Sequence, residues 1–155
     1  MAAWLKLRGH GFLGGRELLE GDGWSGGISW RDRSGFKNIK HRPDLIACPR
    51  DRGRVAIEVE LTKKSVERLR AILLLHAVWT GHQTGGVIYV CADEDGCERV
   101  TKHGAHVGLV KGRGLRVELL DTIKAQARAA HEAVRATRLC RDSAAPPPML
   151  AIDGA

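Results

Sequence analysis

The sequence predicts an α/β domain with a mixed central sheet flanked by helices, and three stretches lead to that prediction. Residues 45–48 and 54–61 are apolar stretches separated by a gap that begins with Pro49 and ends with Gly53, which is typical of an antiparallel β-hairpin. Residues 66–80 are apolar almost all round, so we expect a buried helix. Val87–Cys91 is a continuous apolar run that suits an interior strand. A strand, a helix and a second strand imply a right-handed crossover with parallel pairing.

The length of 155 residues fits one domain, which we place at residues 1–141. Residues 142–155 contain three consecutive prolines and no periodic pattern, so we expect a flexible tail. No apolar run approaches the roughly 18 uncharged residues of a membrane span. The first residues lack the apolar core of a secretory signal, so we expect a cytoplasmic protein with reduced cysteines.

The remaining elements follow from shorter patterns. Ser65 suits the N-cap of the long helix. Trp24 and Trp30 lie in a segment that we expect to be a loop or ragged strand. We expect the two tryptophans to close over the core rather than to stack on bases. The other expectations are a short helix at 16–20, a lead into the hairpin at 36–41, a helix at 94–102, strands at 107–110 and 115–120 joined by a hairpin turn, and a final helix from 121 or 122 to about 141.

The second arm of the hairpin places two carboxylates on one face. Glu58 and Glu60 alternate with the apolar residues Val55, Ile57, Val59 and Leu61. A hairpin centred on Asp51 puts Asp44 opposite Glu58, where facing Cβ atoms lie roughly 5 Å apart. We therefore expect Asp44, Glu58 and Glu60 to form one patch.

Two interpretations of this patch stay open at this point. Carboxylates this close repel one another unless one takes up a proton or a cation is shared. Carboxylate oxygens suit Mg²⁺ or Mn²⁺, and such an ion beside a phosphodiester can activate water and stabilise the leaving oxygen. Alternatively, Glu58 and Glu60 form the solvated face of a half-exposed strand.

The order of these residues resembles the PD-(D/E)xK nuclease superfamily. The matching order is Pro43-Asp44, a turn, a strand carrying Glu58-Val59-Glu60, then Thr62-Lys63 and a helix. Within the superfamily this order is most similar to the nuclease-like domain of replication-relaxation proteins, which mobile genetic elements of bacteria encode. The resemblance covers about residues 4–121 and is specific in the hairpin. It implies a restriction-endonuclease-like core and a Mg²⁺- or Mn²⁺-dependent deoxyribonuclease.

The resemblance also implies roles for five residues. Asp44 and Glu58 correspond to the metal ligands of the superfamily. Glu60 stands where the superfamily usually has lysine, so it is either a third ligand or a replacement for that lysine. Lys63 or Lys64 then supplies the ammonium from the end of the strand. A small nuclease of this kind that cuts both strands would normally dimerise, and a protein partner that supplies DNA specificity is consistent with the resemblance.

The charge of the chain favours an anionic partner. The net charge is +7, and residues 99–141 carry all of it, with ten Lys or Arg against three acids. Within the final helix, basic residues recur at spacings of three and four and form a stripe that can follow a phosphate backbone. The predicted DNA contacts are Arg68, Lys111, Arg113, Lys124, Arg128, Arg135 and Arg138.

Two alternatives belong to other functional classes. A DNA-binding accessory protein of replication or transfer, without catalysis, is consistent with Glu60 in the lysine position and with the basic helix. A zinc-stabilised domain would use Cys91, Cys97, His103 and His106, although their spacing fits the common zinc motifs poorly. We interpret His76 and His82 as a core-edge histidine and a loop histidine rather than as ligands.

Overall fold

A computed structural model describes residues 5–6, 9–20, 24–50 and 53–142, without the side chains of residues 15, 16, 32 and 138–142. The predicted tail from residue 143 onward and the hairpin centre at Asp51 lie outside this description. The elements are β1 (Gly11–Gly14), α2 (Gly15–Glu20), β2 (Gly26–Asp32), β3 (Gly35–His41), β4 (Leu45–Cys48), β5 (Val55–Glu60), α3 (Val66–Trp79), β6 (Val87–Cys91), α4 (Glu94–His106), β7 (Val110–Lys111), β8 (Gly114–Leu119) and α5 (Leu120–Asp142).

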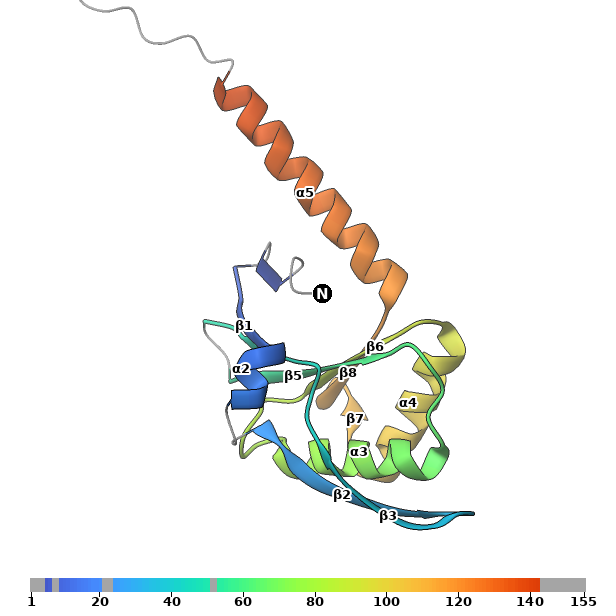
Figure 1. Ribbon diagram of the computed structural model, residues 1–155. Coiled ribbons are helices and arrows are strands. Elements are labelled where there is room, and N and C mark those ends of the chain that lie inside the picture. The colour runs from blue at the N-terminus through green and yellow to red at the C-terminus, as the bar shows by residue number, and fades with distance from the viewer. Residues whose placement is uncertain (1–4, 7–8, 21–23, 51–52, 143–155) are drawn as a thin grey trace, which may run out of the picture.

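The predicted α/β class with a mixed sheet is confirmed. Six strands form one sheet in the order β1-β4-β5-β6-β8-β7 (Figure 1). The pairs β1-β4 and β4-β5 are antiparallel, whereas β5-β6 and β6-β8 are parallel. The parallel pairing of β5 with β6 through α3 is the crossover that the sequence predicts.

The hairpin of β4 and β5 has the predicted register. Leu45 pairs with Ile57, and extending that register by one residue puts Asp44 opposite Glu58. The Asp44 backbone N–H donates to the carbonyl of Ile57 at 3.1 Å, so the two chains are still paired at this point. Asp44 therefore directly precedes β4 and lies on the same face of the sheet as Glu58.

Helix α3 begins where the sequence places its cap. The Ser65 hydroxyl accepts a hydrogen bond from the Arg68 N–H at 3.2 Å, which satisfies one of the free donors of the first turn. The helix lies between the six-stranded sheet and the β2–β3 ribbon (Figure 1). This position explains why α3 is apolar on more than one face.

The two faces of the six-stranded sheet have separate cores. On one face, side chains of α3 and α4 such as Leu73 and Val100 pack against Ile46 and Ala56 of the sheet. On the other face, the core contains Leu5, Ala47, Ile57, Val90 and Ile123. Glu58 and Glu60 alternate with Ile57 along β5, so they lie on the face that α3 and α4 cover.

The structure corrects the prediction for residues 24–41. A loop or ragged strand was expected at 21–35 and a lead into the hairpin at 36–41, but β2 and β3 form a regular antiparallel pair in which Ile28 faces Ile39 and Trp30 faces Lys37. The pair has few apolar residues because its packing on α3 involves only one face. Trp24 and Trp30 pack against the core, as expected, and the Arg68 guanidinium lies 5.8 Å from the Trp30 ring centroid.

A second correction concerns the stretch after β6. Helix α4 continues to His106 rather than ending at residue 102, and Val107 is its C-cap. The Leu109 N–H bonds to the Gly104 carbonyl at 2.9 Å, so the start of the expected strand at 107–110 instead closes the helix. Strand β7 is two residues long and pairs parallel with β8, so the predicted hairpin was wrong, whereas β8 itself was predicted.

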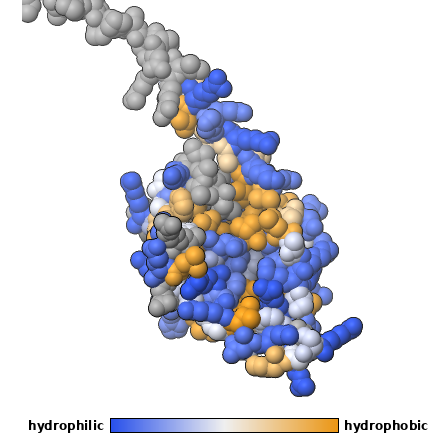
Figure 2. All heavy atoms as spheres, in the orientation of Figure 1, coloured by the Kyte–Doolittle hydropathy of each residue, from blue (hydrophilic) through white to orange (hydrophobic). Residues whose placement is uncertain are grey.

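Among its described side chains, helix α5 packs into the core near its start. Ile123 is buried in the second core, but Val134 is 46% exposed. Figure 1 shows the helix extending well beyond the sheet, and Figure 2 shows apolar atoms gathered where it leaves the core. No helix in the described ranges combines the length and the apolar character needed to cross a membrane.

Candidate metal centre

Glu58 and Glu60 are buried, so they do not form a solvated strand face. Their exposed fractions are 5% and 8%, because β5 is an interior strand and α3 covers this face. The interpretation of these residues as solvent-facing glutamates was therefore wrong. A buried carboxylate is costly unless it is hydrogen-bonded or paired with a cation, and each of the two has such partners.

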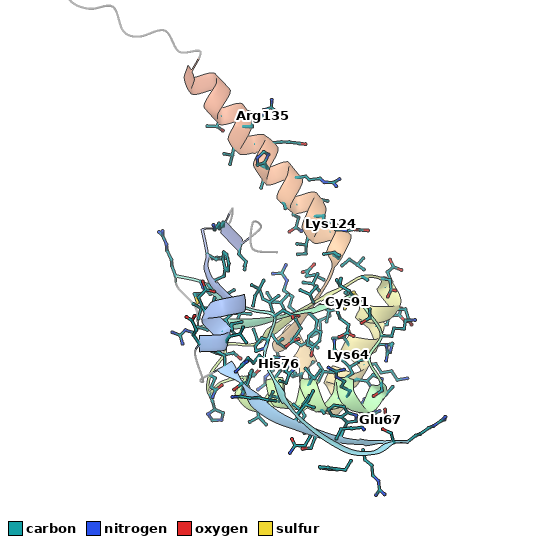
Figure 3. The ribbon with its side chains drawn as sticks, in the orientation of Figure 1. Lys64, Glu67, His76, Cys91, Lys124 and Arg135 are labelled. Atoms are coloured by element: carbon teal, nitrogen blue, oxygen red, sulfur yellow. The ribbon has the colours of Figure 1, made fainter. Side chains whose placement is uncertain are left out.

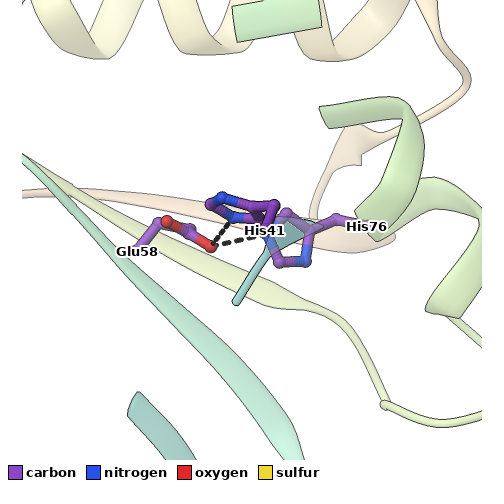
Figure 4. A group of neighbouring side chains, drawn as sticks. All are labelled: His41, Glu58 and His76. Carbon is purple, nitrogen blue, oxygen red and sulfur yellow. Dashed lines mark hydrogen bonds and ion pairs between the residues drawn. The ribbon is translucent and has the colours of Figure 1, made fainter. Parts of the chain in front are cut away.

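Two histidines bind the carboxylate of Glu58. Nε2 of His41 and Nε2 of His76 each lie 2.8 Å from the same oxygen, Glu58 Oε1 (Figure 4). The candidate ligand atoms of the three residues all lie within 4.8 Å of one another. His76 is fully buried, whereas the side chain of His41 is 12% exposed. We call these residues the His–Glu–His cluster.

Three elements bring the cluster together. His76 shares a face of α3 with Leu69, Ile72 and Leu73, so it points at the sheet, as Figure 3 shows. Glu58 is central in β5, and His41 is the last residue of β3. The cluster therefore joins the sheet, the long helix and the β2–β3 ribbon.

The histidines determine the charge state of Glu58. Burial by itself raises the pKa of Glu58, but hydrogen bonds and positive charge from His41 and His76 outweigh it, and the pKa lies below its ordinary value. Glu58 is therefore an anion at neutral pH, as a metal ligand must be.

Tyr89 lies beside the cluster. It pairs with Glu58 in the β5–β6 register, and its ring centroid is 6.1 Å from that of His76. Burial, with the negative charges of Glu58 and Glu60, raises the pKa of Tyr89 well above its ordinary value. The Tyr89 hydroxyl and Nδ1 of His76 are buried without a hydrogen-bond partner in the described part of the chain.

Asp44 lies near Glu58 but outside the cluster. Its Oδ2 accepts a hydrogen bond from the Val59 N–H at 2.7 Å, and the residue is exposed. The carboxyl group of Asp44 is nevertheless partly shielded from solvent, which raises its pKa more than this bond lowers it, and the charge of Glu58 raises the pKa further. The two carboxylates therefore interact electrostatically, as their register predicts.

Of the two candidate lysines, Lys64 is the one beside the carboxylates. Its ammonium forms an ion pair with Oε2 of Glu60, and its backbone N–H donates to Oε1 of Glu60 at 3.3 Å. The Lys64 charge also acts on Asp44, where it lowers the pKa. Lys63 instead pairs with Asp95 of α4 at 2.5 Å, and its side chain is 64% exposed.

The His–Glu–His cluster could hold a metal ion, because it offers two imidazole nitrogens and one carboxylate oxygen at close range. Of the predicted ligands Asp44, Glu58 and Glu60, only Glu58 belongs to it. The metal-binding roles of Asp44 and Glu60 stay predictions.

The four residues of the zinc hypothesis do not form such a group among the described residues. The thiols of Cys91 and Cys97 are free and hydrogen-bond to each other, but Nδ1 of His103 accepts a hydrogen bond from Nε of Arg70 at 3.2 Å. Nδ1 of His106 lies 2.8 Å from the carbonyl oxygen of Lys102 in its own helix.

The predicted DNA contacts lie in several places. Lys111 and Arg113 are exposed at the β7–β8 turn, whereas Arg68 lies over Trp30 with a buried Nε. Exposed side chains of α5 form the basic stripe, namely Lys124, Arg128, His131 and Arg135. The side chain of Arg138 lies outside the described residues. The stripe belongs to the helix anchored on the sheet face opposite Glu58, so the structure does not join the two features.

No protein-family profile matches the chain, and neither does a curated protein or a solved structure. The functional conclusions therefore rest on the chemistry of the chain's own residues.

Sequence reasoning missed both histidines of the cluster. His76 follows Leu69, Ile72 and Leu73 at helical spacing, and this pattern could have placed it on the buried face. His41 depends on the β2–β3 ribbon, which packs on α3 and was not predicted as a regular pair. His82, by contrast, is exposed in a turn, as expected.

Proposed function

We propose that the chain is a metal-dependent DNA nuclease with a restriction-endonuclease-like core. One observation carries the proposal: Asp44, Glu58 and Glu60 share one face of the sheet, with the Lys64 ammonium among them. Antiparallel strands, a crossover helix and a parallel strand occur in the order that the resemblance implies. The positions of the carboxylates in this order match those of the metal ligands of the PD-(D/E)xK superfamily.

The residues at this face of the sheet have different roles in the proposed hydrolysis of a phosphodiester. Glu58 and Asp44 would hold a divalent ion, Mg²⁺ or Mn²⁺, which would activate water and neutralise charge on the phosphate. The His41 and His76 hydrogen bonds keep Glu58 ionised and oriented. Glu60 holds the Lys64 ammonium next to the carboxylates, where it can stabilise the negative charge that develops on the phosphate.

A second candidate is a DNA-binding protein without catalysis. Glu60 is engaged by Lys64, and the basic stripe of α5 belongs to the helix on the opposite sheet face. Such a protein would bind DNA in EDTA as well as in Mg²⁺ and would cut no DNA with any divalent ion. The nuclease remains our first choice, because a pure binding function gives no reason to bury Glu58 and Glu60 side by side.

The test is a cleavage assay on supercoiled, linear, single-stranded and branched DNA with Mg²⁺, Mn²⁺ or EDTA. We expect cleavage with a divalent ion, and a loss of at least about 100-fold in the Asp44→Ala variant, because a bound metal supplies several kcal/mol of transition-state stabilisation.

The matched control is Asp95→Ala, which removes an exposed carboxylate that pairs with Lys63 and lies outside the His–Glu–His cluster. We expect this variant to cut at the wild-type rate. Equal cleavage by the Asp44 variant would contradict the proposal, and binding without cleavage in any divalent ion would favour the binding protein.

A further inference from the structure

We infer that the His–Glu–His cluster is a binding site for a first-row transition-metal ion, of the class of Zn²⁺ or Co²⁺, and that it discriminates against Mg²⁺. The inference goes beyond the proposed function: both histidines approach Oε1 of Glu58, so the cluster ion uses that oxygen and leaves Oε2 for the Mg²⁺ or Mn²⁺ of that proposal. The inference requires no DNA and no cleavage, so it can be tested on the protein alone.

The donor atoms select the class of metal. Imidazole nitrogen suits zinc, iron, nickel and copper, whereas Mg²⁺ prefers oxygen ligands and keeps much of its water. Two of the three donors here are imidazole nitrogens, from His41 and His76, and the third is a Glu58 oxygen. Two histidines with one carboxylate are a known ligand set of catalytic zinc and of non-haem iron.

The distances allow all three donors to reach one ion. Ligand atoms on a tetrahedral ion lie about 3.4 Å apart when the bonds are about 2.1 Å long. The two Nε2 atoms are each 2.8 Å from Glu58 Oε1, and no pair of donors exceeds 4.8 Å. Small rotations of the three side chains, which move the ligand atoms by a few tenths of an ångström to about one ångström, therefore convert the hydrogen-bonded cluster into a coordination site.

The surroundings also suit an ion. The Tyr89 hydroxyl is buried beside Glu58 and has no partner in the described part of the chain. A hydrated ion supplies the oxygen partner that the protein does not. Entry is available from the side of His41, which is the least buried residue of the cluster and lies three residues before the exposed Asp44.

The experiment is titration of the purified full-length chain, stripped with EDTA, with Zn²⁺, Co²⁺ and Mg²⁺ by calorimetry. Visible absorption of the Co²⁺ form reports ligation by nitrogen and oxygen. We expect one equivalent of Zn²⁺ or Co²⁺, little binding of Mg²⁺, and affinity at least about tenfold weaker in His41→Gln, because one of three ligands is lost.

The matched control is His106→Gln, which removes an exposed histidine outside the cluster. We expect unchanged Zn²⁺ affinity in this variant. His41 is partly exposed, so its replacement is expected to leave a folded protein, which circular dichroism verifies. No Zn²⁺ or Co²⁺ binding, binding that His41→Gln leaves intact, or equally tight Mg²⁺ binding would each overturn the inference.

The two proposals fail in different ways. Zn²⁺ binding that depends on His41, with no DNA cleavage in any ion, would remove the nuclease and leave the metal site. Mg²⁺-dependent cleavage that requires Asp44, in a chain that binds neither Zn²⁺ nor Co²⁺, would remove the metal site and leave the nuclease. Asp44→Ala is expected to keep Zn²⁺ binding, because Asp44 lies outside the cluster.

Discussion

The Tyr89 hydroxyl is a buried polar group without a hydrogen-bond partner in the described part of the chain. An unpaired buried donor costs about 1–3 kcal/mol. Replacing Tyr89 with Phe removes the hydroxyl and keeps the ring that packs in the core. We expect Tyr89→Phe to raise the free energy of unfolding by about 1 kcal/mol in EDTA, measured by urea denaturation.

The same variant has a second use at the metal centre. In saturating Zn²⁺ the wild-type hydroxyl gains a partner, so the advantage of Tyr89→Phe is expected to shrink or disappear. A variant that is less stable than wild type in EDTA would show that the hydroxyl is already satisfied, and would remove this support for the ion site.

At the scale of the elements, α3 and α4 are joined by the hydrogen bond from Nε of Arg70 to Nδ1 of His103. Burial, and then the charge of Arg70, lower the pKa of His103 below its ordinary value. His103 therefore binds a proton more tightly in the unfolded chain than in the folded chain. The contribution of His103 to stability is present above its unfolded pKa and is lost as the pH falls through the lowered folded pKa.

This linkage predicts a difference between wild type and His103→Gln. Glutamine can accept from Arg70 without titrating, so the variant should lose less stability than wild type between pH 7 and pH 5. Urea unfolding at both values measures the difference. Equal losses would mean that protonation of His103 does not oppose this helix contact.

The elements also show what sequence can predict. The β4–β5 hairpin, its register and the crossover through α3 depend on local patterns, namely alternation, Pro and Gly in the gap, and a serine cap. The β2–β3 ribbon escaped prediction because it has few apolar residues and is held by packing on α3. His41 was missed for the same reason, and with it the metal-competent cluster.

The whole molecule separates its carboxylates from its basic helix. Sequence placed the excess positive charge in residues 99–141 and the carboxylate patch in the hairpin. It could not show that Glu58 and the Ile123 anchor of α5 lie on opposite sheet faces, because that depends on how the chain crosses between strands. DNA that contacts both features would have to pass around an edge of the sheet.

The projecting part of α5 gives this arrangement a direct test. Arg128 and Arg135 are exposed on a helix whose far end leaves the core, as Figure 3 shows for Arg135, so their replacement should not disturb folding. If the helix follows duplex DNA, the double variant Arg128→Gln/Arg135→Gln should reduce the slope of log affinity against log salt by about 1.8, since each phosphate contact contributes about 0.9.

A charge-matched control separates helix contact from general attraction. Arg31→Gln/Arg33→Gln removes the same charge from exposed positions on the β2–β3 ribbon, which covers the opposite side of the molecule. We expect that variant to keep the wild-type slope in fluorescence anisotropy titrations. A reduced slope in the control but not in the α5 variant would place the DNA along the carboxylate side, where a nuclease site would need it, and would leave α5 without a role in binding. Equal reductions in both would mean that the excess charge attracts DNA without a defined path.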